Sequence, residues 1–196
     1  SESPEILIAG CGTGQHAITT ASKYKKSKIL ALDLSFKSLS YAKRKANELK
    51  INNIDFIQGD ILDLESIDRK FDIIESVGVL HHMNNPFTGW KILTSCLNKK
   101  SLMLIGLYSE KARQHIIQIR NKINDLKLEY NYKNIIKFRK DLIESNNDQW
   151  NDIISSPDFY TVSGVRDLLF HVQEQRFTIS TIKEYLNKLG LIFVGF

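Results

Sequence analysis

Three glycines spaced two residues apart follow a short apolar run in the stretch PEILIAGCGTGQHAI, residues 4–18. They are Gly10, Gly12 and Gly14, and Cys11 lies between the first two. Glycine adopts positive φ angles and lets a ligand approach the backbone closely. At a turn from a strand to a helix, such glycines predict a binding site for a phosphate, a dinucleotide or a nucleoside.

The residues that follow Gly14 separate these three ligands. A phosphate loop ends in Gly-Lys-Ser or Gly-Lys-Thr, whereas this chain continues with Gln15 and His16, and this excludes a phosphate loop. The dinucleotide fingerprint G-x-G-x-x-G requires a glycine where the chain has Gln15. A nucleoside is therefore the favoured ligand, and a nicotinamide dinucleotide is the alternative.

Two aspartates stand at the ends of the next two apolar runs, KILALDL and IDFIQGD. Asp33 ends the first run, where a carboxylate can accept hydrogen bonds from both hydroxyls of a ribose. Asp60 ends the second run and can accept a hydrogen bond from an adenine amino group, with Ile61 packed on the ring. The structural alternatives are a helix cap at Asp33 and a solvated turn at Asp60.

Apolar runs alternate with amphipathic segments over the first half of the chain. This alternation predicts a doubly wound α/β fold, a mostly parallel sheet with helices on both faces. The expected strands cover residues 5–9, 28–34, 54–60, 71–77 and 101–108. Helices are expected over residues 15–25, after a cap at Ser35, and around Trp90. A last helix ending at Gly190 and a sixth strand over residues 191–196 are also expected.

The alternation is interrupted between residues 109 and 178. Residues 109–145 are expected to be mostly helical, and residues 146–178 are less regular. We expect one domain, residues 1–196, with residues 109–178 as a mostly helical insertion. The helical stripe expected in this insertion consists of Ala112, Ile116, Ile119, Ile123 and Leu126.

The first half of the chain resembles the class I S-adenosylmethionine-dependent methyltransferases in the ordered stretches ILIAGCGTG, ILALDLS, FIQGDILDL and FDIIESVGVLHHM. The resemblance implies a Rossmann-like methyltransferase fold, the cofactor S-adenosylmethionine, and residues 109–178 as a substrate cap. It implies that Asp33 binds the ribose, Asp60 binds the adenine, and residues 75–79 face the methionine portion. The cofactor-binding residues expected on this basis are Gly10, Cys11, Gly12, Gly14, Asp33, Leu34, Asp60, Ile61, Glu75, Ser76 and Val77.

The chain departs from the family pattern at three places. Ile8 stands where the family often has an acid, so backbone and water contacts are expected to replace that acid near the methionine amine. The turn NKK, residues 98–100, replaces the common Pro-Gly-Gly and is a more strained choice. The helix that usually precedes the first strand and the last, antiparallel strand are missing, as expected for a part of a longer multidomain chain.

Methyl transfer is an in-line displacement in which an enzyme mainly aligns the nucleophile, and a general base can help. His82 is the first candidate for a base or a substrate contact, His81 is the second, and Tyr108 is a further pocket candidate. The structural alternatives are hydrogen-bonded histidines at a helix start and an interface tyrosine. No metal site is expected, because adjacent histidines are predicted to point apart.

The stretch FYTVSGVRDLLFHVQEQRF, residues 159–177, supplies the candidates for substrate binding. They are Tyr160, Arg166, Asp167 and His171. Asp167 and His171 are four residues apart and would share one helix face. A structural tie that holds the cap is the alternative. The stretch also resembles a segment of methyltransferase domains that accompany tetratricopeptide repeats in bacterial proteins.

The composition favours a cytoplasmic protein with no membrane partner. The two cysteines are expected to be reduced, no apolar run approaches the ~20 residues of a membrane span, and no signal peptide is evident. The net charge is +5, and residues 110–140 contain nine Lys or Arg but only three acids. This basic segment could meet an acidic substrate or a nucleic acid, or it could be a solvated helical face.

The expected function is methyl transfer from S-adenosylmethionine to an O, N or C nucleophile of a small molecule or a protein. A nucleic-acid acceptor is less favoured, because the Asn-Pro-Pro-Tyr or Asp-Pro-Pro-Tyr signature is absent after the fourth strand. Two other functions stay open: an NAD-dependent oxidoreductase and a cofactor-binding module without turnover.

Overall fold

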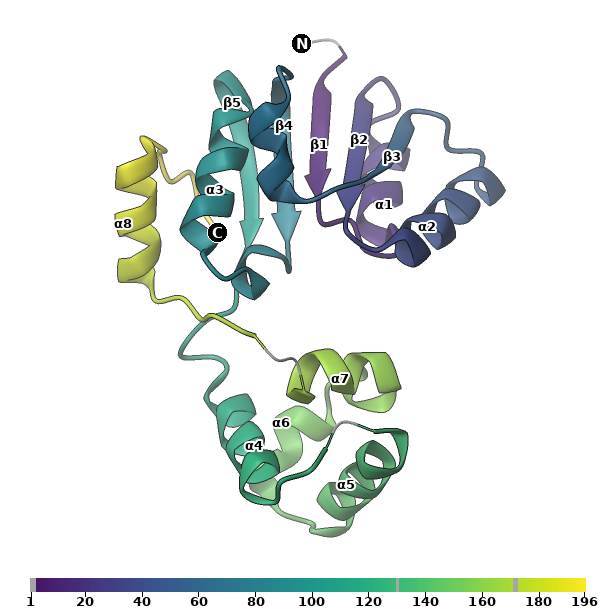
Figure 1. Ribbon diagram of the computed structural model, residues 1–196, viewed down its shortest axis with the longest axis vertical. Helices are drawn as coiled ribbons and strands as arrows, with labels where there is room; N and C mark the ends of the chain where they lie inside the picture. Colours follow the sequence, from purple (N-terminus) through teal and green to yellow (C-terminus); the bar gives the residue numbers. More distant parts are fainter. Residues whose placement is uncertain (1–2, 130, 171–172) are drawn as a thin grey trace. The chain divides into compact units, whose positions relative to one another are not determined.

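The computed structural model describes residues 3–129, 131–170 and 173–196, and the chain divides into two compact units. The first comprises Ser1–Leu107 and Ile179–Phe196 and is called the sheet unit below. The second comprises Tyr108–Thr178 and is called the helical unit (Figure 1). In the part of the chain that the structure describes, no helix is both long and apolar enough to cross a membrane.

The sheet unit contains five parallel strands in the order β3-β2-β1-β4-β5. The strands are β1 (Glu5–Ala9), β2 (Lys28–Asp33), β3 (Ile54–Gln58), β4 (Phe71–Val77) and β5 (Leu97–Gly106). The α-helices are α1 (Gln15–Lys23), α2 (Phe36–Glu48), α3 (Pro86–Ser95) and α8 (Ile179–Leu189). Two 3₁₀ helices, η1 (Ile61–Ser66) and η2 (Leu80–His82), complete the unit. This is the predicted doubly wound, Rossmann-like fold.

Helices cover both faces of the sheet at β1, where successive side chains point to opposite faces, whereas Leu102 and Leu104 of β5 are exposed. On one face, Ile6 and Ile8 of β1 form a core cluster with Ala17 of α1. On the other face, Leu7 of β1 forms a second cluster with Trp90 of α3. The strands therefore read as continuous apolar runs, which is typical of a parallel sheet covered by helices.

Two predicted helix ends are confirmed. The Ser35 hydroxyl accepts a hydrogen bond from the Ser38 backbone N–H and caps α2. Gly190 follows α8 with φ +65°, and the Leu191 N–H donates to the Leu186 carbonyl at 2.9 Å. These contacts close α8 in the way that a glycine after a helix allows.

The predicted sixth strand is wrong. Residues 191–196 form no strand, and Ile192, Val194 and Phe196 are exposed. An apolar run becomes a strand only when a neighbouring strand pairs with it, and no described segment pairs with this one. The fifth strand also differs, since β5 begins at Leu97 and includes the NKK turn, where Lys100 has φ +62°.

The helical unit has a core of its own, formed by four α-helices. They are α4 (Gln114–Asp125), α5 (Tyr132–Glu144), α6 (Asn151–Ile154) and α7 (Val162–Phe170), with the 3₁₀ helices η3 (Asp148–Trp150) and η4 (Pro157–Tyr160). Ile116, Ile119 and Ile123 of the predicted stripe are buried. Ala112 and Leu126 were predicted wrongly, because they lie outside α4 and are exposed.

A cluster of contacts, called the clasp below, joins the two ends of the helical unit. The Phe177 N–H donates to the Tyr108 carbonyl at 2.8 Å, and the Glu110 N–H donates to the Phe177 carbonyl at 3.0 Å. Glu174, whose side chain is 1% exposed, accepts two hydrogen bonds from Arg113, at 2.9 and 2.7 Å. A second guanidinium, from Arg120, lies 3.1 Å from the same carboxylate.

We predict that Glu174→Gln destabilises the helical unit by about 3 kcal/mol, because it leaves buried guanidiniums without their anion. Burial alone would raise the pKa of the Glu174 carboxyl, but the hydrogen bonds from Arg113 and the charges of three arginines lower the pKa below its ordinary value of 4.5. Since the pKa is lowered in the folded state, the stabilisation by the Glu174 carboxylate is complete above the ordinary pKa of 4.5. It is lost as the pH falls through the lowered pKa.

Hydrogen exchange of residues 108–178 over a pH series measures this effect. Glu144→Gln is the matched control, because Glu144 pairs with Lys140 on the surface, and its loss should cost below about 0.5 kcal/mol. Equal protection in the two variants would show that the clasp does not stabilise the unit.

Candidate functional site

The carboxyl ends of the parallel strands meet at one edge of the sheet, and the strand order reverses between β1 and β4. This position is where doubly wound folds bind ligands. The loop from β1 to α1 lies there and contains Gly10, Gly12 and Gly14, with φ angles of +82°, +53° and +84°. Since L side chains rarely adopt such angles, the loop depends on glycine at all three positions.

The three glycines differ in what surrounds them. A Cβ on Gly10 would lie 2.1 Å from Val79 Cγ2, and a Cβ on Gly14 would lie 2.5 Å from Ala42 Cβ. These two glycines therefore permit close packing within the protein. A Cβ on Gly12 would meet nothing within 4 Å, so the backbone of Gly12 borders open space that a ligand can enter.

Asp33 is held at the end of β2 by the backbone of the neighbouring loops. Its Oδ2 accepts a hydrogen bond from the Gly12 N–H at 2.7 Å, and its Oδ1 accepts one from the Ser35 N–H at 2.8 Å. A carboxylate oxygen has two lone pairs, so both oxygens can still accept a bond from a ligand. The side chain is half-buried and orients a negative charge beside Gly12.

Cys11 of the same loop is buried in the core cluster that contains Ile6 and Ile8. Burial, followed by the nearby charge of Asp33, raises the pKa of the Cys11 thiol to about 12. The thiol is therefore protonated near neutral pH and is no nucleophile.

Glu75 places a second carboxylate at this edge of the sheet. Its Oε2 lies 2.8 Å from His16 Nε2 and accepts a hydrogen bond from the Thr20 hydroxyl at 3.1 Å. Oε1 has no hydrogen-bond partner among the described residues, and the side chain is 12% exposed. Glu75 pairs in register with Ile8, so both side chains lie on the same face of the sheet.

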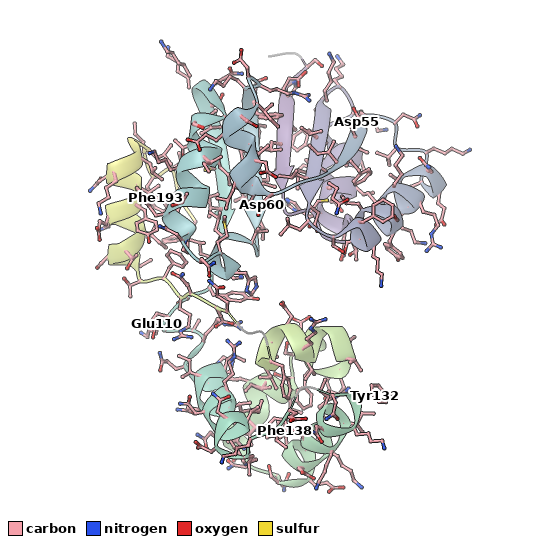
Figure 2. The ribbon with its side chains drawn as sticks, in the orientation of Figure 1. Asp55, Asp60, Glu110, Tyr132, Phe138 and Phe193 are labelled. Atoms are coloured by element: carbon pink, nitrogen blue, oxygen red, sulfur yellow. The ribbon has the colours of Figure 1, made fainter. Side chains whose placement is uncertain are left out.

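Asp60 ends the loop after β3 and begins η1 (Figure 2). Its Oδ1 accepts a hydrogen bond from the Leu62 N–H at 3.0 Å, while Asp63 accepts one from the Asp60 N–H. Asp60 is thus a helix cap whose second oxygen stays available. Ile61 is buried in the core, whereas the apolar side chains of Leu34 and Leu62 are exposed.

The residues after Glu75 line the remaining side of the loop. Ser76 is fully buried, and its hydroxyl has no hydrogen-bond partner within the described part of the chain. Val77 is exposed. Gly78 has φ +77°, and a Cβ there would meet nothing within 4 Å. Gly78 lies within residues 75–79, which are expected to face the methionine portion, and its open backbone adds to the exposed backbone of Gly12.

The two histidines of η2 lie in contact with each other. Their ring centroids are 4.3 Å apart in an edge-to-face arrangement, so the prediction that they point apart was wrong. A short 3₁₀ turn brings the two rings together. His81 is 1% exposed and His82 is half-buried, so His82 is the more accessible imidazole. Within residues 3–129, 131–170 and 173–196, no group of three His, Cys, Asp or Glu could hold a metal ion.

Among the predicted residues of the helical unit, Asp167 lies close enough to Tyr108 for its charge to act on the phenol, whereas Tyr160 contacts Arg139. The Arg113 guanidinium stacks 3.6 Å from the centroid of the Tyr108 ring. Burial, then the charge of Asp167, raises the pKa of the Tyr108 phenol. Tyr160 lies beside Arg139, which donates to its carbonyl at 3.2 Å, and Arg166 is exposed on α7. His171, also predicted to bind substrate, lies outside the described residues.

The helical unit also contains a cavity of about 240 Å³ that sequence reasoning missed. The polar residues of its lining are Arg113, His115, Asp152, Ser156 and Asp158. These residues come from three separate elements and two loops, so no spacing along the chain marks them as neighbours.

A family model described as "Methyltransferase domain" matches residues 3–188. An uncharacterised protein of Synechococcus is 28% identical over 98% of this chain and 48% of its own length. A probable (S)-tetrahydroprotoberberine N-methyltransferase of Papaver bracteatum is 30% identical over 58% of this chain and 31% of its own length. The chain thus spans about half of the first relative and about a third of the second.

Among solved structures, PKMT2 from Rickettsia typhi in complex with AdoHcy matches with a TM-score of 0.73 and 22% identity. The match covers 95% of this chain and 38% of that chain. A match over so much of the chain includes most of the helical unit, so PKMT2 shares the fold of both parts.

We predict that Gly14→Ala lowers the free energy of unfolding by about 3 kcal/mol, whereas Gly12→Ala lowers it by about 1 kcal/mol. Both substitutions place a side chain at positive φ, which costs ~1–2 kcal/mol. Only Gly14→Ala also overlaps Ala42, and such overpacking costs ~1–3 kcal/mol. Urea denaturation of the two variants measures the difference, and equal losses would contradict the packing role of Gly14.

Proposed function

We propose, because the chain belongs to the class I S-adenosylmethionine-dependent methyltransferases, that it transfers the methyl group of S-adenosylmethionine to a nucleophile of a small molecule or a protein. One arrangement carries this proposal. The open backbone at Gly12 lies beside the Asp33 carboxylate, at the edge of the sheet where the strand order reverses.

The residues at this edge fit a nucleoside with a cationic amino-acid tail. Asp33 would accept hydrogen bonds from the ribose hydroxyls, because both of its oxygens retain a lone pair. Asp60 would accept a hydrogen bond from the adenine amino group through its second oxygen. The exposed side chains of Leu34 and Leu62 would contact the apolar faces of the base.

Glu75 would bind the ammonium group of the methionine portion. No described residue donates a hydrogen bond to its Oε1, and its Oε2 is fixed by His16 and Thr20. The carboxylate is therefore held in place with one oxygen available to a ligand. A charge-assisted hydrogen bond of this kind is stronger than a neutral one. The acid that the family often has at position 8 is thus replaced from the adjacent strand, where we expected only backbone and water contacts.

When bound, S-adenosylmethionine supplies a methyl group that is activated by the positive charge of its sulfur. The protein then has to orient the acceptor and, for a protonated nucleophile, to accept a proton. His82 would accept that proton on its imidazole, and the buried His81 ring would hold the His82 ring in place by their edge-to-face contact. The raised pKa of Tyr108 makes its phenol a hydrogen-bond donor and no base near neutral pH.

The acceptor is proposed more broadly than the cofactor. One relative is named an N-methyltransferase and another, from Priestia megaterium, a malonyl-[acyl-carrier protein] O-methyltransferase. Nitrogen and oxygen nucleophiles are therefore both proposed as methyl acceptors, and a carbon nucleophile is a third chemical option. We assign acceptor recognition to the helical unit, because the family resemblance implies a substrate cap over residues 109–178, which make up most of this unit.

We predict that calorimetric binding of three ligands distinguishes the ribose contact of Asp33 from the ammonium contact of Glu75. The ligands are S-adenosylhomocysteine, methylthioadenosine and NAD. Methylthioadenosine has the nucleoside but lacks the amino acid. Asp33→Ala should weaken the binding of S-adenosylhomocysteine and of methylthioadenosine alike, by about 10- to 100-fold, because hydrogen bonds to a charged group contribute ~1.5–3 kcal/mol. Glu75→Gln should weaken only S-adenosylhomocysteine.

Asp55→Asn is the control, because Asp55 is an exposed acid on β3 (Figure 2). It should change the affinity for neither S-adenosylhomocysteine nor methylthioadenosine. Binding of NAD in preference to S-adenosylhomocysteine would overturn the proposed cofactor. If Glu75→Gln weakened the binding of both adenosine ligands equally, the proposed ammonium contact would be refuted and the proposed cofactor would not.

We predict that His82→Ala lowers turnover by about 10²-fold or more, the usual contribution of a general base, while S-adenosylhomocysteine affinity stays unchanged. Transfer of a radiolabelled methyl group to a panel of amines, carboxylates, phenols and proteins measures turnover. Unchanged turnover in this variant would remove His82 as the base. Binding of the cofactor without transfer to any acceptor would instead support a module without turnover.

A further inference from the structure

Helix α5 of the helical unit carries two apolar faces, and the other described residues of this unit cover only one of them. The covered face belongs to the core of the unit and consists of Ile135, Phe138 and Leu142. The second face contains Tyr132, Ile136 and Ile143, which are 64%, 44% and 48% exposed. Figure 2 shows Phe138 inside the unit and Tyr132 on its outer side.

The three exposed apolar residues and the half-buried Arg139 lie along one stripe. Positions 132, 136, 139 and 143 follow one another at spacings of four, three and four, so they line up along one side of a helix. With a rise of 1.5 Å per residue, the stripe is about 16 Å long. Tyr132, Ile136, Arg139 and Ile143 are called the outer α5 face below.

Arg139 is fixed in the middle of the outer α5 face. Its guanidinium lies 5.5 Å from the centroid of the Phe159 ring and 5.9 Å from that of the Tyr160 ring. Its Nη2 also donates to the Tyr160 carbonyl. These contacts hold the exposed Tyr160 next to the stripe, which enlarges the surface with a second aromatic residue.

Lysines follow one edge of the stripe. With 100° between successive residues, Lys133, Lys137 and Lys140 fall on the same side of Ile136, and all three are exposed. Lys140 pairs with Glu144 at 3.6 Å. Lys133 and Lys137 have no ion pair among the described residues, so this edge carries positive charge that a partner can neutralise.

We propose that the outer α5 face docks an acidic, amphipathic helix of another protein. The isoleucines gain from burial against apolar side chains, and the lysines gain from ion pairs with carboxylates. The partner that fits therefore presents an apolar stripe bordered by Glu or Asp. A helix of about three turns matches the length of the stripe. A nucleic acid would neutralise the lysines but would leave Ile136 and Ile143 without apolar contacts. The docking does not depend on methyl transfer and is measured by binding alone.

The test uses the full chain and a fluorescent peptide of about 20 residues, long enough to form a helix. The peptide has leucines at spacings of four, three and four and glutamates beside them, and a second peptide has lysines in place of the glutamates. Fluorescence anisotropy should detect binding of the acidic peptide and no binding of the basic one. Ile136→Ser should weaken binding of the acidic peptide about tenfold, and so should Lys133→Glu combined with Lys137→Glu. A tenfold loss corresponds to about 1.4 kcal/mol.

Matched controls separate this face from general stickiness and general charge. Leu126→Ser removes an exposed apolar side chain elsewhere in the helical unit, and Lys25→Glu with Lys26→Glu reverses two exposed charges of the sheet unit. Neither should change the affinity. Salt at about 0.5 M should abolish the effect of the lysine variant but keep that of Ile136→Ser, since salt screens only the charges.

Two results would overturn the proposal. One is an acidic peptide that fails to bind, or that binds all variants equally. The other is a lysine-dependent binding of oligouridylate or of phosphatidylglycerol vesicles in the absence of peptide binding, which would assign the face to nucleic acid or to a lipid surface.

Discussion

The hydrogen bond from the Gly12 N–H to the Asp33 carboxylate is the contact on which the site depends. It joins the turn after β1 to the end of β2 at 2.7 Å, and it forms only because Gly12 has positive φ. The same turn starts α1, whose close approach to α2 needs the missing Cβ of Gly14. One loop conformation thus fixes a carboxylate, an open stretch of backbone and the packing of two helices.

The proposed replacement of the acid at position 8 by Glu75 is made possible by the parallel register. Ile8 of β1 and Glu75 of β4 are neighbours on one face of the sheet, so a carboxylate can be supplied from either strand. With the acid on β4, position 8 is free to join the apolar cluster that contains Ile6 and Ala17. A charged group on the face of a sheet needs polar partners, and His16 and Thr20 of α1 supply them.

The sequence predicts best those features that local chemistry determines. The glycine turn, the Asp33 position, the five strands and the caps at Ser35 and Gly190 all follow from residue types within a few positions of each other. The failures concern features that residue type and periodicity do not determine. Residues 191–196 have the composition of a strand, but strand formation needs a pairing neighbour. Likewise, the contact between His81 and His82 depends on a short 3₁₀ turn, which no periodicity announces.

The helical unit shows why an insertion can carry binding surfaces of its own. Its ends meet at the clasp, where Phe177 pairs with Tyr108 and a buried Glu174 neutralises arginines from both ends. Because the two ends of the unit meet and the unit encloses a core of its own, its surface residues can change without disturbing that core. The outer α5 face is such a surface: its isoleucines add nothing to the core of the unit, and exposed apolar side chains aligned along a helix mark an interaction site more often than scattered ones do.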